Sequence, residues 1–217
     1  RDRSEHCKNL YEIGRGNSGR SNWETNLFHG AYDKAEHHER VKYGALNLFQ
    51  SKSGIASCCG YGNVHFVLKK HINKRTSFVC GDSASMMFHI CTFKYNNQLL
   101  LFLEENILKD LINHVLSENK NYNYYKNYNY VEAQIHGFVR FDTDIESLVI
   151  KRNLLTKSIE NFCYNNKIQI KIIYEIWNLK NKDKLEKIEI HFPKIKNNFD
   201  LIIRQLNLFL NEIKMSF

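Results

Sequence analysis

The stretch YVEAQIHGFV, residues 130–139, carries polar side chains at alternate positions: Glu132, Gln134 and His136. In an extended strand these side chains share one face, and successive ones lie about 6.6 Å apart. A carboxylate, an amide and an imidazole on one face can converge on a single ligand. The carboxylate can then stabilise developing positive charge or accept a proton. The same alternation also fits a half-buried strand whose polar face meets water. The pattern alone leaves both interpretations open.

The elements that would position this stretch have the order of an α+β protein. Short apolar runs bounded by Gly, Ser or Asn predict strands at 42–49, 63–70 and 75–81. From residue 96 the apolar residues follow a helical period, with Leu100, Leu103, Ile107, Leu111 and Val115 on one side. The polar, Gly-rich residues 1–40 predict loop, and the Tyr- and Asn-rich run at 121–130 predicts a surface insertion.

The second half of the chain predicts further helices and strands. They are a turn and short element at 143–150, a helix at 154–166, strands at 167–179 and 184–192 that form a hairpin, and a helix at 199–215. Asn198 or Asp200 is placed to cap the last helix. The order lacks the βαβ alternation of a doubly wound sheet. We expect a single domain over 1–217, with its core at about 10–150 and the C-terminal hairpin and helix packed outside it.

A glycine-rich stretch, GRGNSG at 14–19, matches the spacing G-x-G-x-x-G of dinucleotide-binding folds. That fingerprint needs a buried strand before it and a helix after it. The preceding KNLYEI is a poor buried strand, and the following RSNWETNLFHG is a poor helix. We therefore interpret these glycines as positions where the backbone approaches another group closely. RTSFVCGDS at 75–83 either offers hydroxyls to a phosphate or is a strand that ends in a turn.

The histidines and cysteines do not predict a metal site. His37 and His38 lie between Glu36 and Glu39, but no third ligand has a recognisable spacing, so a polar loop is the simpler interpretation. The six cysteines show no CxxC spacing, and the adjacent Cys58 and Cys59 suit a disulfide framework poorly. We expect reduced thiols and hence a cytosolic working compartment.

The net charge of +8 would favour an acidic partner, but its distribution weakens that inference. Lysines are scattered among asparagines from about residue 150, without the basic and aromatic repeats of single-strand binders, so we expect a solvated surface and no nucleic acid. The longest apolar run, around 99–103, is too short to span a membrane. The chain starts at Arg1 without methionine, which suggests a fragment of a longer protein.

Several stretches occur together in the order of a bacterial family of unknown function that resembles ADP-ribosyltransferases. They are LFHGAYD (27–33), ERVKYGALNL (39–48), GNVHFVLKKHINKRTSFVCGDS (62–83) and EAQIHGFV (132–139). In this respect the chain resembles the CteC-type effectors, which ADP-ribosylate host ubiquitin on a threonine. The resemblance covers roughly residues 10–150, and the rest of the chain adds little to it.

The resemblance implies a mixed β-sheet split around an NAD cleft, with flanking helices. It assigns Glu132 as the catalytic glutamate, which bonds the nicotinamide ribose and stabilises the oxocarbenium-like transition state. Gln134 would orient the acceptor or the ribose, and His136 would either do likewise or pack against the next strand. The implied NAD contacts are Gly14, Asn17 and Ser18 in the first loop and Tyr43, Gly44 and Ala45 on the second strand. The phosphate-binding arginine has no secure match, and Arg15, Arg40 and Arg75 are candidates by charge.

By the same resemblance, the expected activity is mono-ADP-ribosylation of a protein hydroxyl, a threonine of host ubiquitin, which blocks ubiquitination. NAD would be the co-substrate, and the protein would be a monomeric bacterial toxin and virulence factor secreted into the host cytosol. Two alternatives stay open at this point. One is an ADP-ribosyltransferase that acts on a nucleic acid or another protein, and the other is a catalytically silent module that binds NAD or ubiquitin.

Overall fold

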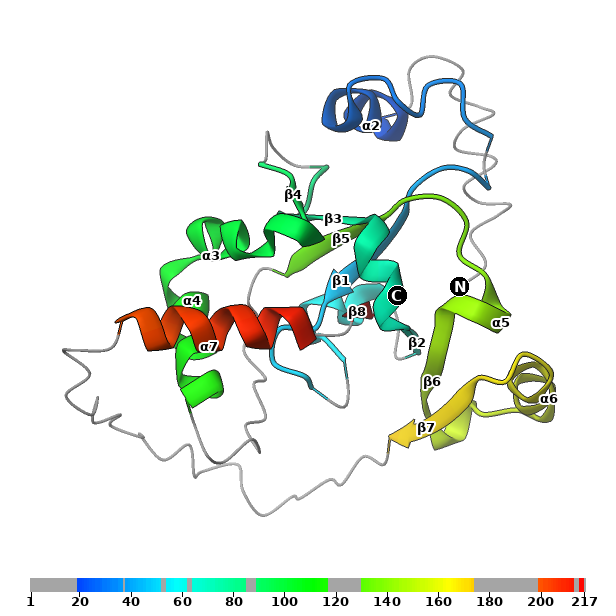
Figure 1. The fold of residues 1–217 in the computed structure, drawn as a ribbon. Helices are drawn as coiled ribbons and strands as arrows, with labels where there is room; N and C mark the ends of the chain where they lie inside the picture. Colours follow the sequence, from blue (N-terminus) through cyan, green and yellow to red (C-terminus); the bar gives the residue numbers. More distant parts are fainter. Residues whose placement is uncertain are drawn as a thin grey trace.

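The computed structural model describes residues 19–36, 38–51, 54–61, 64–84, 89–116, 130–173, 199–212 and 215–216. Within these residues a mixed β-sheet packs against several helices, so the predicted α+β class is confirmed at that level (Figure 1). Residues 121–129 of the predicted surface insertion, most of the C-terminal hairpin and Asn198 lie outside the described residues. The other cap candidate, Asp200, lies inside the last helix, Phe199–Glu212, rather than before it.

The sheet has the strand order β4-β3-β5-β1-β8-β2-β6-β7. The strands are β1 (Lys42–Leu46), β2 (His65–Leu68), β3 (Thr76–Cys80), β4 (Cys91–Thr92), β5 (Val131–Ile135), β6 (Ile145–Lys151), β7 (Gln169–Ile173) and β8 (Met215–Ser216). Neighbouring strands pair antiparallel, except that β6 and β7 are parallel. The short β8 joins two parts, which we call the first half-sheet (β4, β3, β5, β1) and the second half-sheet (β2, β6, β7).

The described helix α2 precedes β1, and the other described helices lie between strands in the chain. The α-helices are α2 (Gly19–Phe28), α3 (Leu99–Phe102), α4 (Glu105–Leu116), α5 (Phe141–Asp144), α6 (Lys157–Asn165) and α7 (Phe199–Glu212). The 3-10 helices are η1 (Ala56–Tyr61), η2 (Lys70–Arg75), η3 (Phe93–Gln98) and η4 (Arg152–Leu154). Strands at 42–49, 63–70 and 75–81 and helices at 154–166 and 199–215 were predicted, and β1, β2, β3, α6 and α7 confirm them.

The core lies on the face of the first half-sheet to which Val131, Ala133 and Ile135 point. All three are at most 1% exposed and belong to one apolar cluster. The helices α3, α4 and α7 supply the other side of this cluster, with Leu99, Leu103, Ile107, Leu111, Leu206 and Leu210. In Figure 1, α7 crosses α4 beside the sheet. The apolar side of the YVEAQIHGFV stretch is therefore fixed by the core, which fixes its polar side as well.

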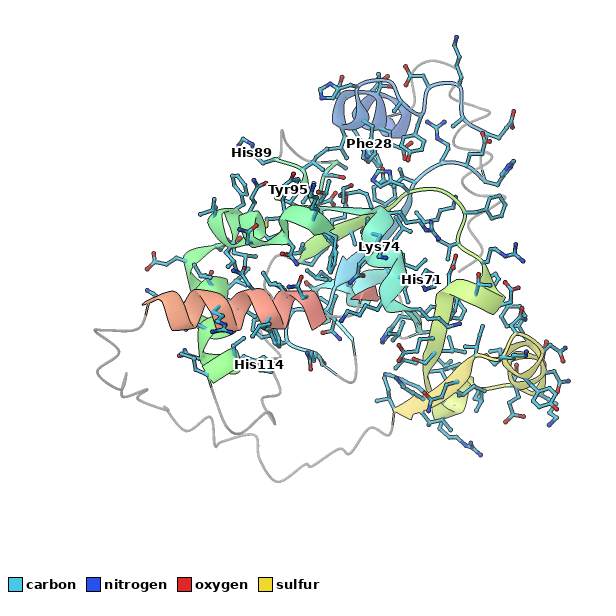
Figure 2. The ribbon with its side chains drawn as sticks, in the orientation of Figure 1. Phe28, His71, Lys74, His89, Tyr95 and His114 are labelled. Carbon is cyan, nitrogen blue, oxygen red and sulfur yellow. The ribbon has the colours of Figure 1, made fainter. Side chains whose placement is uncertain are left out.

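The prediction of loop throughout residues 1–40 is wrong, because α2 covers Gly19–Phe28. The sequence of α2 has no apolar stripe, so the spacing of its apolar residues does not predict a helix. The helix is anchored instead by specific contacts. Glu24 is 1% exposed and forms an ion pair with Arg40, while the Phe28 ring meets Tyr32 edge-on at 5.3 Å. Figure 2 shows Phe28 on the side of α2 that faces the sheet.

The helix predicted from residue 96 is not continuous. The chain forms η3 and α3, becomes extended at Leu103 and then starts α4. The break keeps Leu99, Leu103 and Ile107 in the core, and Glu105 occupies the first turn of α4, where a carboxylate interacts favourably with the helix dipole. The apolar spacing therefore predicted the buried side chains correctly but not the backbone.

Two expectations about the second half of the chain also need correction. The parallel pair β6 and β7, with α6 between them, is a βαβ unit, although no such alternation was predicted. The last helix does not pack outside the core, because Leu206 and Leu210 of α7 belong to the same apolar cluster as β5. The residues after α7 also return to the sheet as β8. The C-terminal part is thus built into the domain.

Candidate functional site

The polar face of β5 is the centre of the candidate site. β5 lies between β3 and β1, and residues that face each other across antiparallel strands point to the same side of the sheet. Glu132 is opposite Ala45 and Val79, and Gln134 is opposite Tyr43 and Ser77. Glu132 is 6% exposed and Gln134 is fully buried. The interpretation of a half-buried strand whose polar face meets water is therefore wrong, since both faces of β5 are buried.

Two donors hold one oxygen of the Glu132 carboxyl group. Ser83 Oγ donates to Oε1 at 2.5 Å, and Gln134 Nε2 donates to the same oxygen at 2.8 Å. The other oxygen, Oε2, receives no side-chain hydrogen bond from the described residues. Burial raises the pKa of Glu132 above its ordinary value, and the bonds from Ser83 and Gln134 offset this in part. The site thus contains a carboxylate that is fixed at one oxygen and destabilised in its charged form.

His136 continues the same polar row one residue beyond the end of β5. Its Nε2 lies 2.9 Å from Ser77 Oγ, and its Nδ1 lies 2.6 Å from the Tyr32 hydroxyl. Ser77 Oγ in turn donates to Gln134 Oε1 at 2.9 Å. Burial lowers the pKa of His136, and the positive charge of Arg75 lowers it further. The imidazole is therefore neutral at physiological pH and connects Tyr32 to the face of β5.

A second buried carboxylate, Glu24 of α2, meets the same side of the sheet. Arg40 contacts Glu24 Oε2 through NH2 at 3.1 Å, and Tyr43 donates from its hydroxyl to Glu24 Oε1 at 3.1 Å. The pKa of Tyr43 is raised by burial, then by the charge of Glu24, with a smaller contribution from Glu132. Tyr43 on β1 therefore interacts electrostatically with both carboxylates, and its hydroxyl is bonded to Glu24 of α2.

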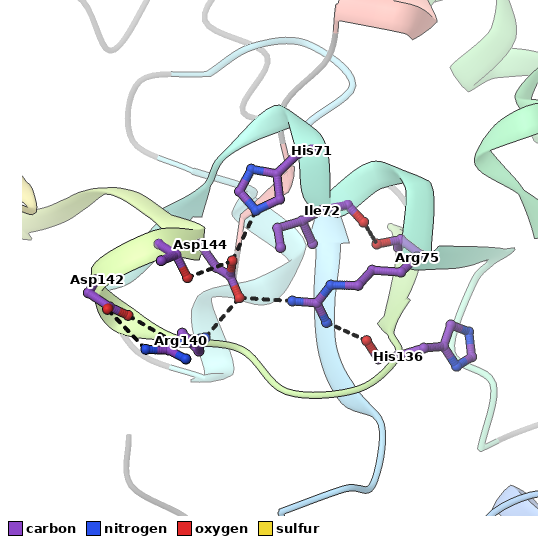
Figure 3. A network of polar contacts seen from close by, with 9 residues as sticks. His71, Ile72, Arg75, His136, Arg140, Asp142 and Asp144 are labelled. Carbon is purple, nitrogen blue, oxygen red and sulfur yellow. Dashed lines mark hydrogen bonds and ion pairs between the residues drawn. The ribbon is translucent and has the colours of Figure 1, made fainter.

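Beside this face, Arg75 connects two parts of the sheet (Figure 3). Its guanidinium donates to Asp144 Oδ2 at 2.9 Å and also to the main-chain oxygen of His136. Asp144 accepts further hydrogen bonds from the side chains of His71 and Thr143 and from the main chain of Arg140. Burial raises the pKa of Asp144, but these bonds and the Arg75 charge outweigh that effect and leave the pKa lowered. Arg75 thereby fixes the backbone at the end of β5.

The structure brings five of the predicted site residues together. Glu132, Gln134 and His136 share one hydrogen-bonded row, and Tyr43 and Ala45 face it from β1. Gly44 lies opposite Ala133 and so belongs to the other face. Two of the proposed phosphate ligands, Arg40 and Arg75, form ion pairs with Glu24 and Asp144. The remaining candidates, Gly14, Arg15, Asn17 and Ser18, lie outside the described residues.

Several residues of the site were not singled out from the sequence. Glu24 sits in a helix without an apolar stripe, and Asp144 precedes a strand, so neither position has a local signal. Tyr32 lies within the LFHGAYD stretch, but nothing in its type or spacing indicates a contact with His136, which is far away in the chain. Ser77 and Ser83 had a weak signal, because the hydroxyls of residues 75–83 were noted as possible donors.

The described part of the chain gives two further findings on the class of protein. It contains no group of three or more His, Cys, Asp or Glu side chains that could hold a metal ion. It also has no helix long and apolar enough to cross a membrane. Cys58, Cys80, Cys91 and Cys163 are free thiols, as predicted for these four cysteines.

Residues 12–120 match the family described as "Protein of unknown function (DUF3626)", which covers half of the chain. The chain belongs to this family. The match includes α2, β1, β2, β3 and α4, and thus Glu24, Arg40, Tyr43 and Ser77, but it ends before β5 and Glu132. A search of curated proteins found none that matches this chain.

Proposed function

We propose that this protein is an NAD-dependent mono-ADP-ribosyltransferase and that Glu132 is its catalytic residue. The observation that carries the proposal is the state of the Glu132 carboxyl group. It is buried on the central strand of the first half-sheet, and Ser83 and Gln134 hold Oε1 while Oε2 has no side-chain donor among the described residues. An oxygen in this state can accept a hydrogen bond from a ribose hydroxyl.

The chemistry requires a group that stabilises positive charge. When the bond between ribose carbon C1′ and the nicotinamide nitrogen breaks, its electron pair leaves with nicotinamide, and positive charge develops on the ribose. A fixed carboxylate beside the ribose stabilises that charge more in the transition state than in the ground state. The acceptor hydroxyl then forms a bond to C1′ and gives its proton to a base. The raised pKa of Glu132 favours it as that base, because a carboxylate whose pKa lies closer to neutrality accepts a proton more readily.

Two further features fit NAD as the co-substrate. Tyr43 places an aromatic ring on the same face as Glu132, where it can pack against nicotinamide. The division of the sheet into two half-sheets joined by β8 is compatible with a sheet split around a ligand. Since Arg40 and Arg75 are both paired with carboxylates, Arg15 is left, of the three arginines considered, to bind the phosphates.

For the acceptor, we propose a threonine hydroxyl of ubiquitin, by resemblance to the CteC-type effectors. The bond formed would be an O-glycoside, which resists the neutral hydroxylamine that cleaves ester-linked ADP-ribose from acidic side chains. A hydroxyl with an intrinsically high pKa needs to be positioned near C1′ beside a base rather than deprotonated in advance. Gln134, fixed beside Glu132, is the side chain that we assign to this positioning.

The test is incubation of the protein with labelled NAD and one of three acceptors: ubiquitin, a mixed lysate or single-stranded DNA. We expect ubiquitin to gain the mass of one ADP-ribose and to keep it in hydroxylamine. If a lysate protein or DNA takes the label while ubiquitin does not, the transferase proposal holds and ubiquitin is removed as its substrate. If no acceptor is labelled and calorimetry detects no binding of NAD at millimolar concentration, the transferase proposal is wrong.

A further inference from the structure

An unbroken series of hydrogen bonds runs from Tyr32 to Glu132. From Tyr32 it passes through His136, Ser77 and Gln134, and each donor-acceptor distance lies between 2.6 and 2.9 Å. The three members at the carboxylate end are buried, with Ser77 4% exposed, Gln134 fully buried and Glu132 6% exposed. We call these five residues the Tyr32–Glu132 chain. It joins the loop after α2 to the centre of the sheet through side chains alone.

The direction of this chain follows from what each group can donate. A carboxylate only accepts, so Gln134 donates to Glu132 from Nε2 and turns its Oε1 toward Ser77. Ser77 has one hydrogen and gives it to that Oε1, so it must accept from His136 Nε2. The neutral imidazole therefore carries its hydrogen on Nε2, and Nδ1 accepts the hydrogen of the Tyr32 hydroxyl. Each member of the chain fixes the state of the next.

The surroundings of His136 favour the neutral ring that this direction requires. Phe28 and Tyr32 face the ring from α2 and the loop after it, Ser77 faces it from β3, and Arg75 contacts its main chain from η2. Arg75 is the charged group of this set. A second hydrogen on Nδ1 would point at the Tyr32 oxygen and remove the bond that Tyr32 donates. Protonation of His136 would thus reverse the outer end of the chain.

We propose that Tyr32, His136 and Ser77 are positioning residues that set the orientation of the Gln134 amide and, through it, that of the Glu132 carboxylate. A glutamine amide rotated by half a turn has almost the same shape, so packing alone does not choose between the two orientations. The rotated amide would turn its oxygen toward the oxygen of Glu132. The hydroxyl of Ser77 prevents this, and His136 and Tyr32 decide where the Ser77 hydrogen points. The inference rests on the proposed role of Glu132, which it deepens.

Magnetic resonance tests the chain without any assay of activity. In the wild-type protein, nitrogen-15 shifts should show His136 with its hydrogen on Nε2. Tyr32→Phe removes the donor to Nδ1, so we expect part of the population to carry the hydrogen on Nδ1. Ser77→Ala should raise the carboxyl pKa of Glu132, measured by carbon-13 titration, because Gln134 no longer holds its donor toward Oε1. A His136 hydrogen on Nδ1 in the wild type would overturn the inference.

Ser147 provides a matched control for Ser77. It is a fully buried serine on β6 in the second half-sheet, and its hydroxyl has no hydrogen-bond partner among the described residues. Ser147→Ala therefore also deletes a buried hydroxyl but leaves the Tyr32–Glu132 chain intact. We expect the pKa of Glu132 to move in Ser77→Ala and not in Ser147→Ala. Equal behaviour of the two variants would overturn the inference, whatever the activity of the protein.

Transfer kinetics give a second measure. His136→Phe keeps a ring but no donor, and Ser77→Ala breaks the chain, so both should lower kcat by roughly tenfold to a hundredfold with little change in KM. His136→Gln can still donate from Nε2 to Ser77, so we expect it to recover most of the kcat. Any loss of activity at acid pH that comes from protonation of His136 should be absent in this variant, since an amide does not titrate.

If the wild type shows no transfer, the proposed function fails, and the resonance measurements still test the Tyr32–Glu132 chain. If it shows transfer and His136→Phe matches the wild type, the inference is wrong.

Discussion

Glu132 combines three properties that seldom occur together in a carboxylate without a function. It is buried, it is not paired with a cation in the described structure, and its pKa is raised by the loss of water. A buried ionised group without a counter-ion costs stability. Carboxylates whose pKa is raised by burial concentrate at functional sites. The sequence predicted the shared face of Glu132 and Gln134, because the period of a strand is two. It could not predict their burial or their bonds to Ser77 and Ser83, because those residues are far away in the chain.

Replacement of Glu132 by glutamine tests the catalytic role. Glutamine is nearly isosteric, and its carbonyl oxygen can still accept the bonds from Ser83 and Gln134. We expect Glu132→Gln to keep most of the NAD affinity but to lose transfer by roughly a hundredfold or more, since the charge acts mainly in the transition state. Calorimetry for NAD binding and single-turnover transfer measure the two effects. Wild-type turnover in the variant would show that Glu132 is only a buried polar residue.

The same substitution should not lower stability. Because the pKa of Glu132 is raised in the folded protein, the folded state binds this proton more tightly than the unfolded state does. The contribution of Glu132 to stability therefore falls as the pH rises from the ordinary value of 4.5 through the raised value, and it stays low above that. Glu132→Gln should have a Tm equal to or above that of the wild type at pH 7 to 8, and this advantage should vanish below about pH 4. A variant several degrees less stable at pH 7 would contradict the burial argument.

The strands β1 and β3 of the first half-sheet could be predicted from their sequences, whereas the helix α2 could not. β1 and β3 are short, apolar and bounded by turn residues, so their pattern predicted them. α2 is polar throughout, and its position depends on an ion pair and a few ring contacts that form only in the folded protein. Tertiary contacts of this kind leave no periodic trace in the sequence. The helix whose Glu24 bonds Tyr43 and whose Phe28 contacts His136 was therefore not predicted from the sequence.

The Glu24–Arg40 pair is the contact that should hold α2 in place. Glu24 is 1% exposed and the Arg40 side chain 12%, so Glu24→Ala leaves a mostly buried guanidinium without its carboxylate. We expect a loss of about 3 kcal/mol in the free energy of unfolding, which is typical when one member of a buried pair is removed. Denaturant titration measures this loss. Limited proteolysis should show earlier cleavage near residues 19–40.

A surface pair provides the control for Glu24. Glu160 pairs with Lys157 on α6, where the two side chains are 40% and 83% exposed. Exposed pairs contribute little, so Glu160→Ala should change the free energy of unfolding by less than about 1 kcal/mol. If Glu24→Ala is as mild as Glu160→Ala, the ion pair does not anchor α2, and the apolar contacts of Phe28 must do so instead.

At the level of the whole molecule, the described residues show two connections between the half-sheets besides their shared apolar core. One is β8, which reaches β1 and β2 with its two residues. The other is the polar cluster of Figure 3, where Asp144 at the start of β6 binds Arg75, and Arg75 binds the main chain of His136 after β5. The sequence predicted strands in both half-sheets but neither of these connections, because each connection joins residues that are far apart in the chain. One apolar cluster includes Ile145, Leu148 and Ile150 of β6 as well as residues of β5, so the two half-sheets share a core.

Asp144 should therefore stabilise the whole domain rather than β6 alone. In Asp144→Asn an amide would replace one carboxylate oxygen and face the donors of either Arg75 and Arg140 or His71 and Thr143. We expect a loss of about 2 kcal/mol in the free energy of unfolding at pH 7. That corresponds to a fall in Tm of roughly 4–8 °C for a chain of this size, with one transition if the domain unfolds as a unit. Asp142→Asn is the control, because Asp142 is exposed and bonds only Arg140 among the described side chains.

Since the pKa of Asp144 is lowered in the folded protein, the contribution of Asp144 to stability is fully present above the ordinary pKa of 3.8 and is lost as the pH falls through the lowered pKa. Scanning calorimetry should thus give a constant difference in Tm between the wild type and Asp144→Asn from pH 7 to about pH 5, and a shrinking difference below about pH 4. A difference in Tm that instead grows toward acid, or an equal fall in Tm in Asp142→Asn, would mean that the Asp144 carboxylate does not stabilise the domain through the cluster of Figure 3.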